Sequence, residues 1–246
     1  MLPRMDGELA AREFVWQGRG GPFTLLLGDR MFAPTHTSRE VAESLEVRAG
    51  DTVIDVGCGS GVLSVVAARL GASEVHGTEL NPEGATFARK NVDRLGLTSL
   101  VHIHEGSLFD PLDGVKANVV IGDVSGIPDD IARMTGWFPG GFSGGPTGAE
   151  VPTAMLEQAV EHLAPGGRLY LPTASIQDEG AVLRAARRIF GEGRMRQLRE
   201  RLLPLPGKIA ESAVLRRLKE SGVVNLIRRG SRQLWRLRVW EVQSPR

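Results

Sequence analysis

The chain has 246 residues, a formal net charge of +1 and 41% hydrophobic residues, a composition from which a globular protein can build a sizeable core. No apolar run approaches the ~20 residues that span a bilayer, and the N-terminal segment carries acids and lacks an apolar stretch, so we expect neither a membrane partner nor a signal peptide. The single cysteine, Cys58, is typical of a reducing compartment, and we expect a cytoplasmic protein.

The N-terminal elements come first along the chain. Residues 7–16 are expected to form a helix, which a glycine-rich break ends. Two short apolar runs, at 23–27 and 30–32, flank the turn dipeptide Gly28-Asp29 and predict a hairpin.

A helix capped by Thr37 or Ser38 is expected next, since their hydroxyls can accept hydrogen bonds from the free amides of a first turn. From residue 52 on, strands alternate with helices, which predicts βαβ units and a parallel sheet. Strands are expected at 52–56, 74–80, 100–104, 117–121 and 168–171, and helices at 62–70, 82–95 and 152–163. The tail departs from the alternation, with strands expected at 199–205 and 235–242 around a helix near 209–221.

The most informative motif follows the strand at 52–56. Residues 55–61 are Asp-Val-Gly-Cys-Gly-Ser-Gly, so three glycines lie at alternate positions in a tight turn from strand to helix. Glycine permits positive φ, and without a Cβ the backbone can approach a ligand closely. A glycine-rich turn alone is shared by several nucleotide sites, and the alternative is a turn that binds nothing.

Two further segments follow neighbouring strands. Glu79 ends the strand at 74–80, about twenty residues beyond the glycine turn, where a carboxylate can accept both hydroxyls of a ribose. Leu80 lies next to it, before a helix that begins with Asn-Pro. Ser107 and Leu108 follow the strand at 100–104.

Together these segments resemble the Rossmann-like S-adenosylmethionine-dependent methyltransferases. The resemblance implies S-adenosyl-L-methionine as cofactor and an α/β sandwich with a mostly parallel seven-stranded sheet, an antiparallel C-terminal strand and a short N-terminal helix/hairpin extension. It also implies that the cofactor is held by Asp55, Gly57, Cys58, Gly59, Gly61, Glu79, Leu80, Ser107, Leu108 and Asp123. The family often has Asp where Ser107 stands. We divide the chain into an N-terminal extension and lid at 1–46 and a cofactor-binding domain at 47–246.

Within this superfamily, residues 31–38 and 144–148 resemble segments of the release-factor glutamine methyltransferases. Those enzymes carry Asn-Pro-Pro-Tyr after the fourth strand of the sheet. Here Asp123 occupies the Asn position and no Pro-Pro follows. An ionised carboxylate only accepts hydrogen bonds, whereas an amide also donates, so Asp123 suits a cationic amine or a protic group better than a neutral glutamine amide.

Candidate catalytic residues are Asp123, which can orient or deprotonate the acceptor, and His36, a second base from the lid. The alternatives are an acid that only caps a turn and a histidine that only faces solvent. The loop at 127–151 is long and rich in aromatic residues, which is typical of a binding loop. We expect Phe32, Thr35, Trp137 and Phe142 to contact the acceptor. No cluster has metal-ligand spacing, so no metal is expected.

The methyl acceptor is not named by the sequence. We expect transfer to a nitrogen, less so an oxygen, of a small molecule or peptide. One alternative is an RNA- or ribosome-associated enzyme that modifies a protein, because arginines crowd the last third of the chain. Another is a non-catalytic scaffold that binds the cofactor. The arginines can equally form a solvated face, and the sequence leaves the oligomeric state open.

Overall fold

The computed structural model describes residues 11–138 and 141–245. The strands are β1 (Ala11–Trp16), β2 (Phe23–Gly28), β3 (Thr52–Val56), β4 (Glu74–Glu79), β5 (Val101–Glu105), β6 (Ala117–Ile121), β7 (Leu163–Ala174), β8 (Met195–Pro204), β9 (Ile227–Arg229) and β10 (Arg232–Gln243). The helices are α1 (His36–Ser44), α2 (Val62–Arg69), α3 (Pro82–Arg94), α4 (Asp129–Thr135), α5 (Glu150–His162), α6 (Glu179–Phe190), α7 (Gly207–Ala210) and α8 (Ala213–Glu220), with a 3-10 turn at Glu192–Arg194.

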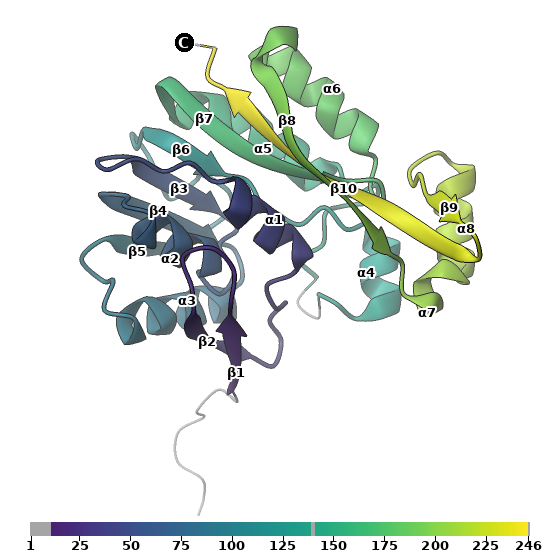
Figure 1. The fold of residues 1–246 in the computed structure, drawn as a ribbon, viewed down its shortest axis with the longest axis horizontal. Coiled ribbons are helices and arrows are strands. Elements are labelled where there is room, and N and C mark those ends of the chain that lie inside the picture. Colours follow the sequence, from purple (N-terminus) through teal and green to yellow (C-terminus); the bar gives the residue numbers. More distant parts are fainter. Residues whose placement is uncertain (1–10, 139–140, 246) are drawn as a thin grey trace, which may run out of the picture.

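The large sheet has the strand order β5-β4-β3-β6-β7-β10-β8 (Figure 1). Strands β3 to β7 are parallel, whereas β10 runs antiparallel to both of its neighbours. The predicted α/β fold, with a mainly parallel sheet and an antiparallel C-terminal strand, is confirmed. The sequence analysis missed β9, which a two-residue turn at Gly230-Ser231 folds back onto the start of β10.

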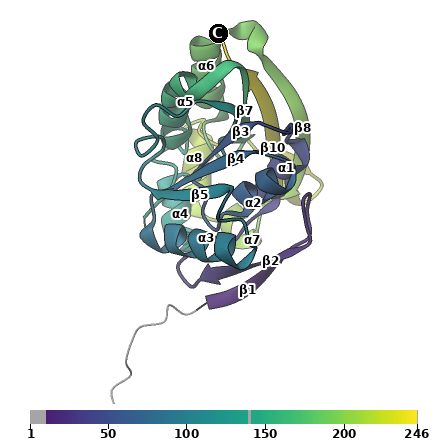
Figure 2. The same cartoon turned by 90° about the vertical axis from the view of Figure 1, so that its left-hand side faces the viewer.

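The sheet is buried on both faces, because alternate residues of its strands enter different hydrophobic clusters. Val53 of β3 packs with the hairpin and with α1 and α2, whereas Ile54 and Val56 pack with α5 and α6 on the opposite face. Figure 2 shows α5 and α6 on the other side of the sheet from α1 and α2. Continuous apolar strands such as β3 are the expected result of burial on both faces.

The N-terminal prediction was wrong in detail. Residues 11–16 form a strand, not a helix, and the rest of the predicted helix lies outside the described residues. Strand β1 pairs with β2, so the hairpin does not involve residues 30–32. The strand forms because pairing with β2 lets Phe14 and Trp16 reach the core, which outweighs the helix propensity of Ala, Arg and Glu.

Side chains fix this hairpin and the next helix in place. The Asn91 amide of α3 bonds the backbone of Leu26 in both directions, at 2.6 and 2.9 Å, and also reaches the Ser60 carbonyl at 3.0 Å. Helix α1 is capped by Thr35, two residues before Thr37 and three before Ser38, and Ser38 completes a capping box. Through the Asn91 amide the hairpin is tied to the glycine turn.

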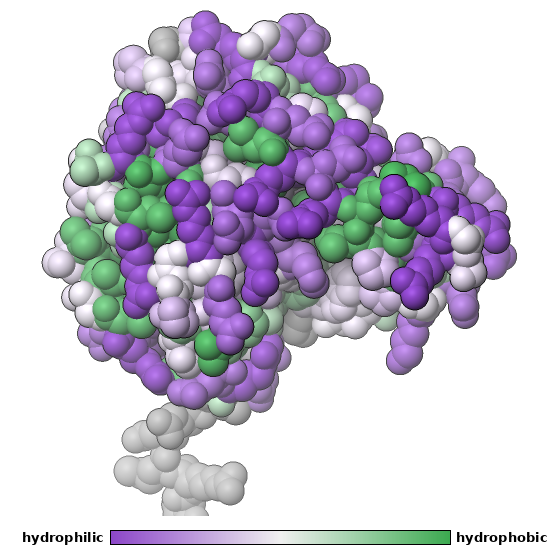
Figure 3. All heavy atoms as spheres, in the orientation of Figure 1, coloured by the Kyte–Doolittle hydropathy of each residue, from purple (hydrophilic) through white to green (hydrophobic). Residues whose placement is uncertain are grey.

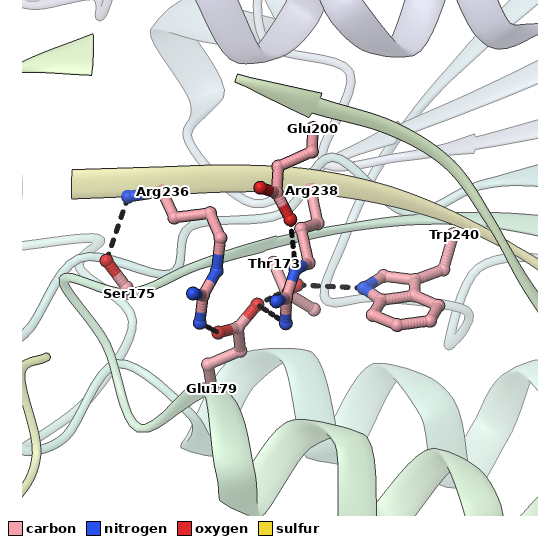
Figure 4. Close-up of polar contacts among 7 residues, drawn as sticks. All are labelled: Thr173, Ser175, Glu179, Glu200, Arg236, Arg238 and Trp240. Atoms are coloured by element: carbon pink, nitrogen blue, oxygen red, sulfur yellow. Dashed lines mark hydrogen bonds and ion pairs between the residues drawn. The ribbon is translucent and has the colours of Figure 1, made fainter. Parts of the chain in front are cut away.

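The C-terminal half contains two helices that the sequence analysis missed. Helix α4 lies inside the loop at 127–151, and α6 covers β7 and β10. Helix α6 is held by Glu179, whose carboxylate receives hydrogen bonds from Thr173, Arg236 and Arg238 at 2.8, 3.1 and 3.5 Å (Figure 4). These arginines therefore serve the fold.

No helix among the described residues is long and apolar enough to cross a membrane.

Candidate functional site

The carboxyl ends of the parallel strands open into a cavity of about 900 Å³. The sheet reverses its strand order between β3 and β6, and such a switch point is where open α/β sheets bind ligands. The segments that follow β3, β4, β5 and β6 line the cavity, together with the entry to α1 and residues from β7, β8 and β10. It is large enough for two ligands side by side.

The glycine turn forms one wall of this cavity. Gly57 and Gly59 have φ values of 69° and 55°, in the left-handed region that favours glycine. A Cβ on Gly59 would meet no protein atom within 4 Å, so this residue presents bare backbone to open space. Gly61 does not line the cavity: it caps α2 and lies against Ala88 of α3.

Cys58 lies in the same turn and is buried. Its amide donates to the Thr78 carbonyl at 2.8 Å, which ties the turn to β4. Burial raises the pKa of the thiol well above its ordinary value, with the charge of Asp55 adding to the effect. The thiol is therefore held neutral, and Cys58 contributes shape rather than nucleophilic chemistry.

Glu79 stands at the end of β4, across from the glycine turn. Its carboxylate accepts from the Asn81 amide at 2.7 Å and from the Gly59 amide at 2.8 Å. Burial raises its pKa, and these backbone donors oppose the increase. A Cβ on Gly84 would lie 2.9 Å from the Glu79 side chain, so glycine there leaves room for the acid. Beside it Leu80 is 50% exposed on the cavity wall.

The turn after β5 contributes Ser107 and Leu108. Leu108 has a φ of 46° and is the one non-glycine residue with positive φ in the part of the chain that the structure describes. Such a conformation is costly and is often found at ligand sites. Both residues line the same cavity as Glu79, and their contact with a cofactor stays a prediction.

Two carboxylates end the neighbouring strands β3 and β6. Asp55 is buried and accepts from Ser64 at 2.6 Å, and burial, with the charge of Asp123 adding to it, raises its pKa to about 7. Burial likewise raises the pKa of Asp123 to about 6, although a hydrogen bond from Ser38 opposes the increase. Both groups therefore titrate close to neutral pH, and a shifted pKa of this kind is characteristic of functional sites.

The entry to α1 faces Asp123. Ser38 bonds both the Asp123 carboxylate and the Thr35 amide, the latter at 3.4 Å, so it links the start of the helix to the end of β6. The Thr35 hydroxyl is used by the helix cap. His36, the first residue of α1, lines the cavity but is exposed.

Aromatic side chains from two segments meet at the cavity. The ring of Phe32 stacks on Phe138 at 4.8 Å and lies 6.1 Å from Trp137, which joins the entry to α1 to the loop after α4. Phe142 also lines the cavity. Phe32 is 40% exposed. Exposing a large apolar side chain to water is unfavourable unless a ligand or partner covers it.

Three polar side chains that the sequence analysis did not select also line the cavity. Thr78 Oγ1, Ser125 Oγ and Gln177 Nε2 are buried without a hydrogen-bond partner. Gln177 follows β7, and its amide oxygen lies so close to Gly126 that a Cβ there would be 2.2 Å away. Buried polar atoms normally have partners, so these atoms are suited to bind a ligand. The only signal in the sequence was their place near strand ends, with Thr78 inside β4 and Ser125 and Gln177 after β6 and β7.

All candidate site residues except Gly61 thus meet around one cavity. Within the described ranges, no group of three His, Cys, Asp or Glu side chains is placed to hold a metal ion.

The fold and the site are similar to those of one class of proteins, the Rossmann-like S-adenosylmethionine-dependent methyltransferases. Within this class, residues 33–141 match the family model described as Ribosomal protein L11 methyltransferase (PrmA). The matched segment contains the glycine turn, Glu79 and Asp123. The similarity to release-factor enzymes stays a prediction.

Curated relatives agree with this match. The chain is 39% identical over 105 residues to a ribosomal protein L11 methyltransferase of Bacillus cereus (strain ATCC 10987 / NRS 248), and similarly to one of Bacillus anthracis (strain CDC 684 / NRRL 3495). The match covers 41% of this chain and 34% of each relative, so the chain matches about a third of their length.

Solved structures share the fold over more of the chain. A 16S rRNA N2 G1207 methyltransferase of T. thermophilus, solved with AdoMet and guanosine, has a TM-score of 0.64 at 18% identity and covers 98% of this chain and 52% of its own. A ribosomal protein L11 methylase of Lactobacillus delbrueckii subsp. bulgaricus has a TM-score of 0.55 at 17% identity and covers 89% of this chain and 84% of its own.

Proposed function

We propose that this protein transfers a methyl group from S-adenosylmethionine to a nitrogen of a ribosome-associated protein. The observation that carries the proposal is Asp123, a carboxylate that lines the cavity where the acceptor must meet the cofactor. A carboxylate favours a cationic amine over a neutral amide. The family-model match at 33–141 includes Asp123, and the curated relatives are named for methylation of ribosomal protein L11. We therefore prefer a macromolecular acceptor to the small molecule favoured by the sequence alone.

The cavity residues fit the cofactor. Bare backbone at Gly59 leaves space for it, Glu79 can accept from the ribose hydroxyls, and Leu80 can cover an adenine ring. The cofactor, when bound, supplies an activated methyl group on a sulfonium. The protein then aligns the acceptor nitrogen, excludes water and removes a proton.

Asp123 is suited to hold or remove that proton. Its pKa of about 6 leaves it mostly ionised at neutral pH, yet basic enough to accept a proton. Ser38 orients the carboxylate from α1. Ser125 and Gln177 offer unpartnered polar groups to the part of the acceptor that flanks the nitrogen.

A nucleobase acceptor is the second candidate. Phe32, Trp137 and Phe138 form an aromatic cluster on which a base could stack, and solved neighbours include enzymes named for tRNA and rRNA methylation.

Transfer of tritium from labelled cofactor to isolated ribosomal particles tests both candidates. We expect label that protease releases and ribonuclease does not, incorporated roughly 10²–10⁴-fold more slowly by the Asp123→Asn variant. If only ribonuclease releases the label, the acceptor is a nucleobase of RNA and not a protein. Label in neither fraction, with cofactor bound, would contradict the proposed function.

A further inference from the structure

We infer that residues 205–235, here called the basic lobe, form a docking surface for the phosphate backbone of RNA. The lobe consists of α7, α8, β9 and the start of β10, and it packs its own apolar residues, including Ile209 and Leu218, against Ile131 of α4 (Figure 1). Leu205, Pro206 and Trp235 of the lobe also line the cavity. A polymer docked on the lobe would therefore pass close to the site of methyl transfer.

The charge of the lobe differs from that of the rest of the chain. It contains seven Lys or Arg and two Glu, a net charge of +5, whereas the whole chain carries +1. The seven cations are all exposed: Lys208, Arg216, Arg217, Lys219, Arg228, Arg229 and Arg232. In Figure 3 hydrophilic side chains cover the outer end of the lobe, at the right of the view. A basic patch of this kind is the electrostatic footprint of a polyanion site.

The arginines of the C-terminal third fall into two groups by their partners. On β8 and β10 they pair with acids of the fold: Arg196 with Glu241, Arg199 and Arg201 with Glu40, Arg236 and Arg238 with Glu179. In the lobe only Arg217 pairs with an acid, Asp130 of α4. The remaining lobe cations have no acidic partner among the described residues. They are therefore available to an external anion.

The β9–β10 hairpin shows that this arrangement does not serve stability. Arg229 and Arg232 are direct cross-strand partners on either side of the Gly230-Ser231 turn. Like charges directly opposite each other destabilise a strand pair, and no acid among the described residues forms an ion pair with either arginine. Arg228 lies beside Arg229, and its side chain donates to the Gly230 carbonyl at 3.1 Å. Phosphates along an RNA strand would neutralise all three charges.

A second hollow in the lobe is less suitable. Its volume is about 300 Å³, and its wall includes Arg216 and Lys219 but also both acids of the lobe, Glu211 and Glu220. Because the charges there are mixed, we assign phosphate contact to the hairpin arginines. The inference deepens the proposed function, because RNA bound to the lobe would hold a ribonucleoprotein substrate beside the cavity. Only the identity of this substrate rests on the proposed function.

The experiment compares two triple variants of the full-length protein. Arg228→Gln/Arg229→Gln/Arg232→Gln removes the hairpin charges, and Arg12→Gln/Arg48→Gln/Arg184→Gln removes three exposed arginines elsewhere. Fluorescence anisotropy measures binding to a labelled single-stranded RNA of about 20 nucleotides, long enough for the lobe to cover. Duplex DNA and poly-glutamate are the competing probes. Neither cofactor nor acceptor is present, so the result is independent of methyl transfer.

We expect the hairpin variant to bind RNA at least about tenfold more weakly at low salt. The slope of log affinity against log salt should become shallower by about 2, the release expected for three phosphate contacts on a single strand. Its thermal midpoint should not fall, because a like-charge pair has been removed. The control variant should bind as the unchanged protein does. Equal losses in both variants, an unchanged slope, or tighter binding of DNA or poly-glutamate than of RNA would overturn the inference.

Discussion

At the scale of single residues, the charge of Asp123 links the structure to an observable pH dependence. Its pKa is raised to about 6, so the carboxylate becomes ionised as pH rises through that value. If the ionised form orients or deprotonates the acceptor, turnover should increase with pH and level off above about 6. Asp123→Asn keeps the shape but removes the charge, and turnover should fall roughly 10²–10⁴-fold with the inflection lost. Initial rates under saturating cofactor measure both effects.

The control for this experiment is Asp55→Asn. Asp55 titrates near 7 and lies in the same cavity, so the inflection near 6 should persist without it.

The raised pKa of Asp123 also affects the free energy of unfolding, which should fall with rising pH where turnover rises. The folded state binds this proton more tightly than the unfolded chain, whose pKa is 3.8, so the stabilisation is complete below about 4 and is lost as pH rises through about 6. An Asp123→Asn enzyme with full turnover would exclude an acid–base role.

Glu79 makes a prediction about the cofactor alone. Removing its carboxylate with Glu79→Ala should weaken cofactor binding by about 1–3 kcal/mol, the usual cost of losing a charged hydrogen-bond acceptor. Titration calorimetry measures the loss. Glu74→Ala, at the other end of β4, provides the control, because Glu74 does not line the cavity. A loss well below ~0.5 kcal/mol for Glu79→Ala would show that this carboxylate does not contact the ribose.

At the scale of elements, α6 is anchored to the sheet by one buried acid. Glu179 is 9% exposed and bonds two arginines of β10 and Thr173 of β7. Glu179→Gln leaves Arg236 without its counter-charge and Arg238 with Glu200 alone, so the free energy of unfolding should fall by about 3–5 kcal/mol. Glu157→Gln on α5 removes an ion pair of similar length that is exposed, and should cost under ~1 kcal/mol. Urea denaturation distinguishes the two; equal losses would contradict the anchoring role.

The elements that the sequence predicted are those with a local signal. Strand β3 and the glycine turn were predicted because burial on both faces and positive φ restrict which residues can stand there. Helix α6 is an exception: it had a local signal in the spacing of Val182, Ala186 and Phe190, which lie on one buried face, and the sequence analysis overlooked it. Strand β1 had none, because only its pairing with β2 overrides a helical composition.

The site residues that the sequence predicted are likewise those with a local signal. Glu79 and Asp123 were found because Glu79 is the last residue of β4 and Asp123 lies two residues beyond β6. Gln177 reaches the same cavity only because β7 lies beside β6 in the sheet, a neighbourhood that depends on tertiary strand order. Gly61 is a residue that the sequence analysis wrongly selected. Its place in the motif indicated a ligand contact, but its positive φ and its contact with Ala88 serve the packing of α2 on α3.

At the scale of the whole molecule, charge and apolar surface are separated. The basic lobe carries a net +5 and leaves the remainder of the chain with an excess of acids. The cavity wall combines carboxylates with the exposed apolar side chains of Phe32 and Leu80. A ligand held there contacts loops from β3, β4, β5 and β6 together, so its binding energy should stabilise the entire sheet and not one element.

This coupling gives a prediction for thermal unfolding. S-Adenosylhomocysteine at about 100 times its dissociation constant should stabilise the protein by about 2.7 kcal/mol and raise the midpoint by roughly 5–10 °C. Gly59→Val should abolish the shift, because its side chain enters the open space in front of the turn and its φ of 55° is unfavourable for a branched residue. The same open space means that no protein atom blocks the new side chain, so the variant should still fold. ATP should give no shift, since the cavity wall offers carboxylates and few cations to a triphosphate. Differential scanning fluorimetry makes the comparison, and a shift with ATP equal to that with S-adenosylhomocysteine would show a general nucleotide site instead.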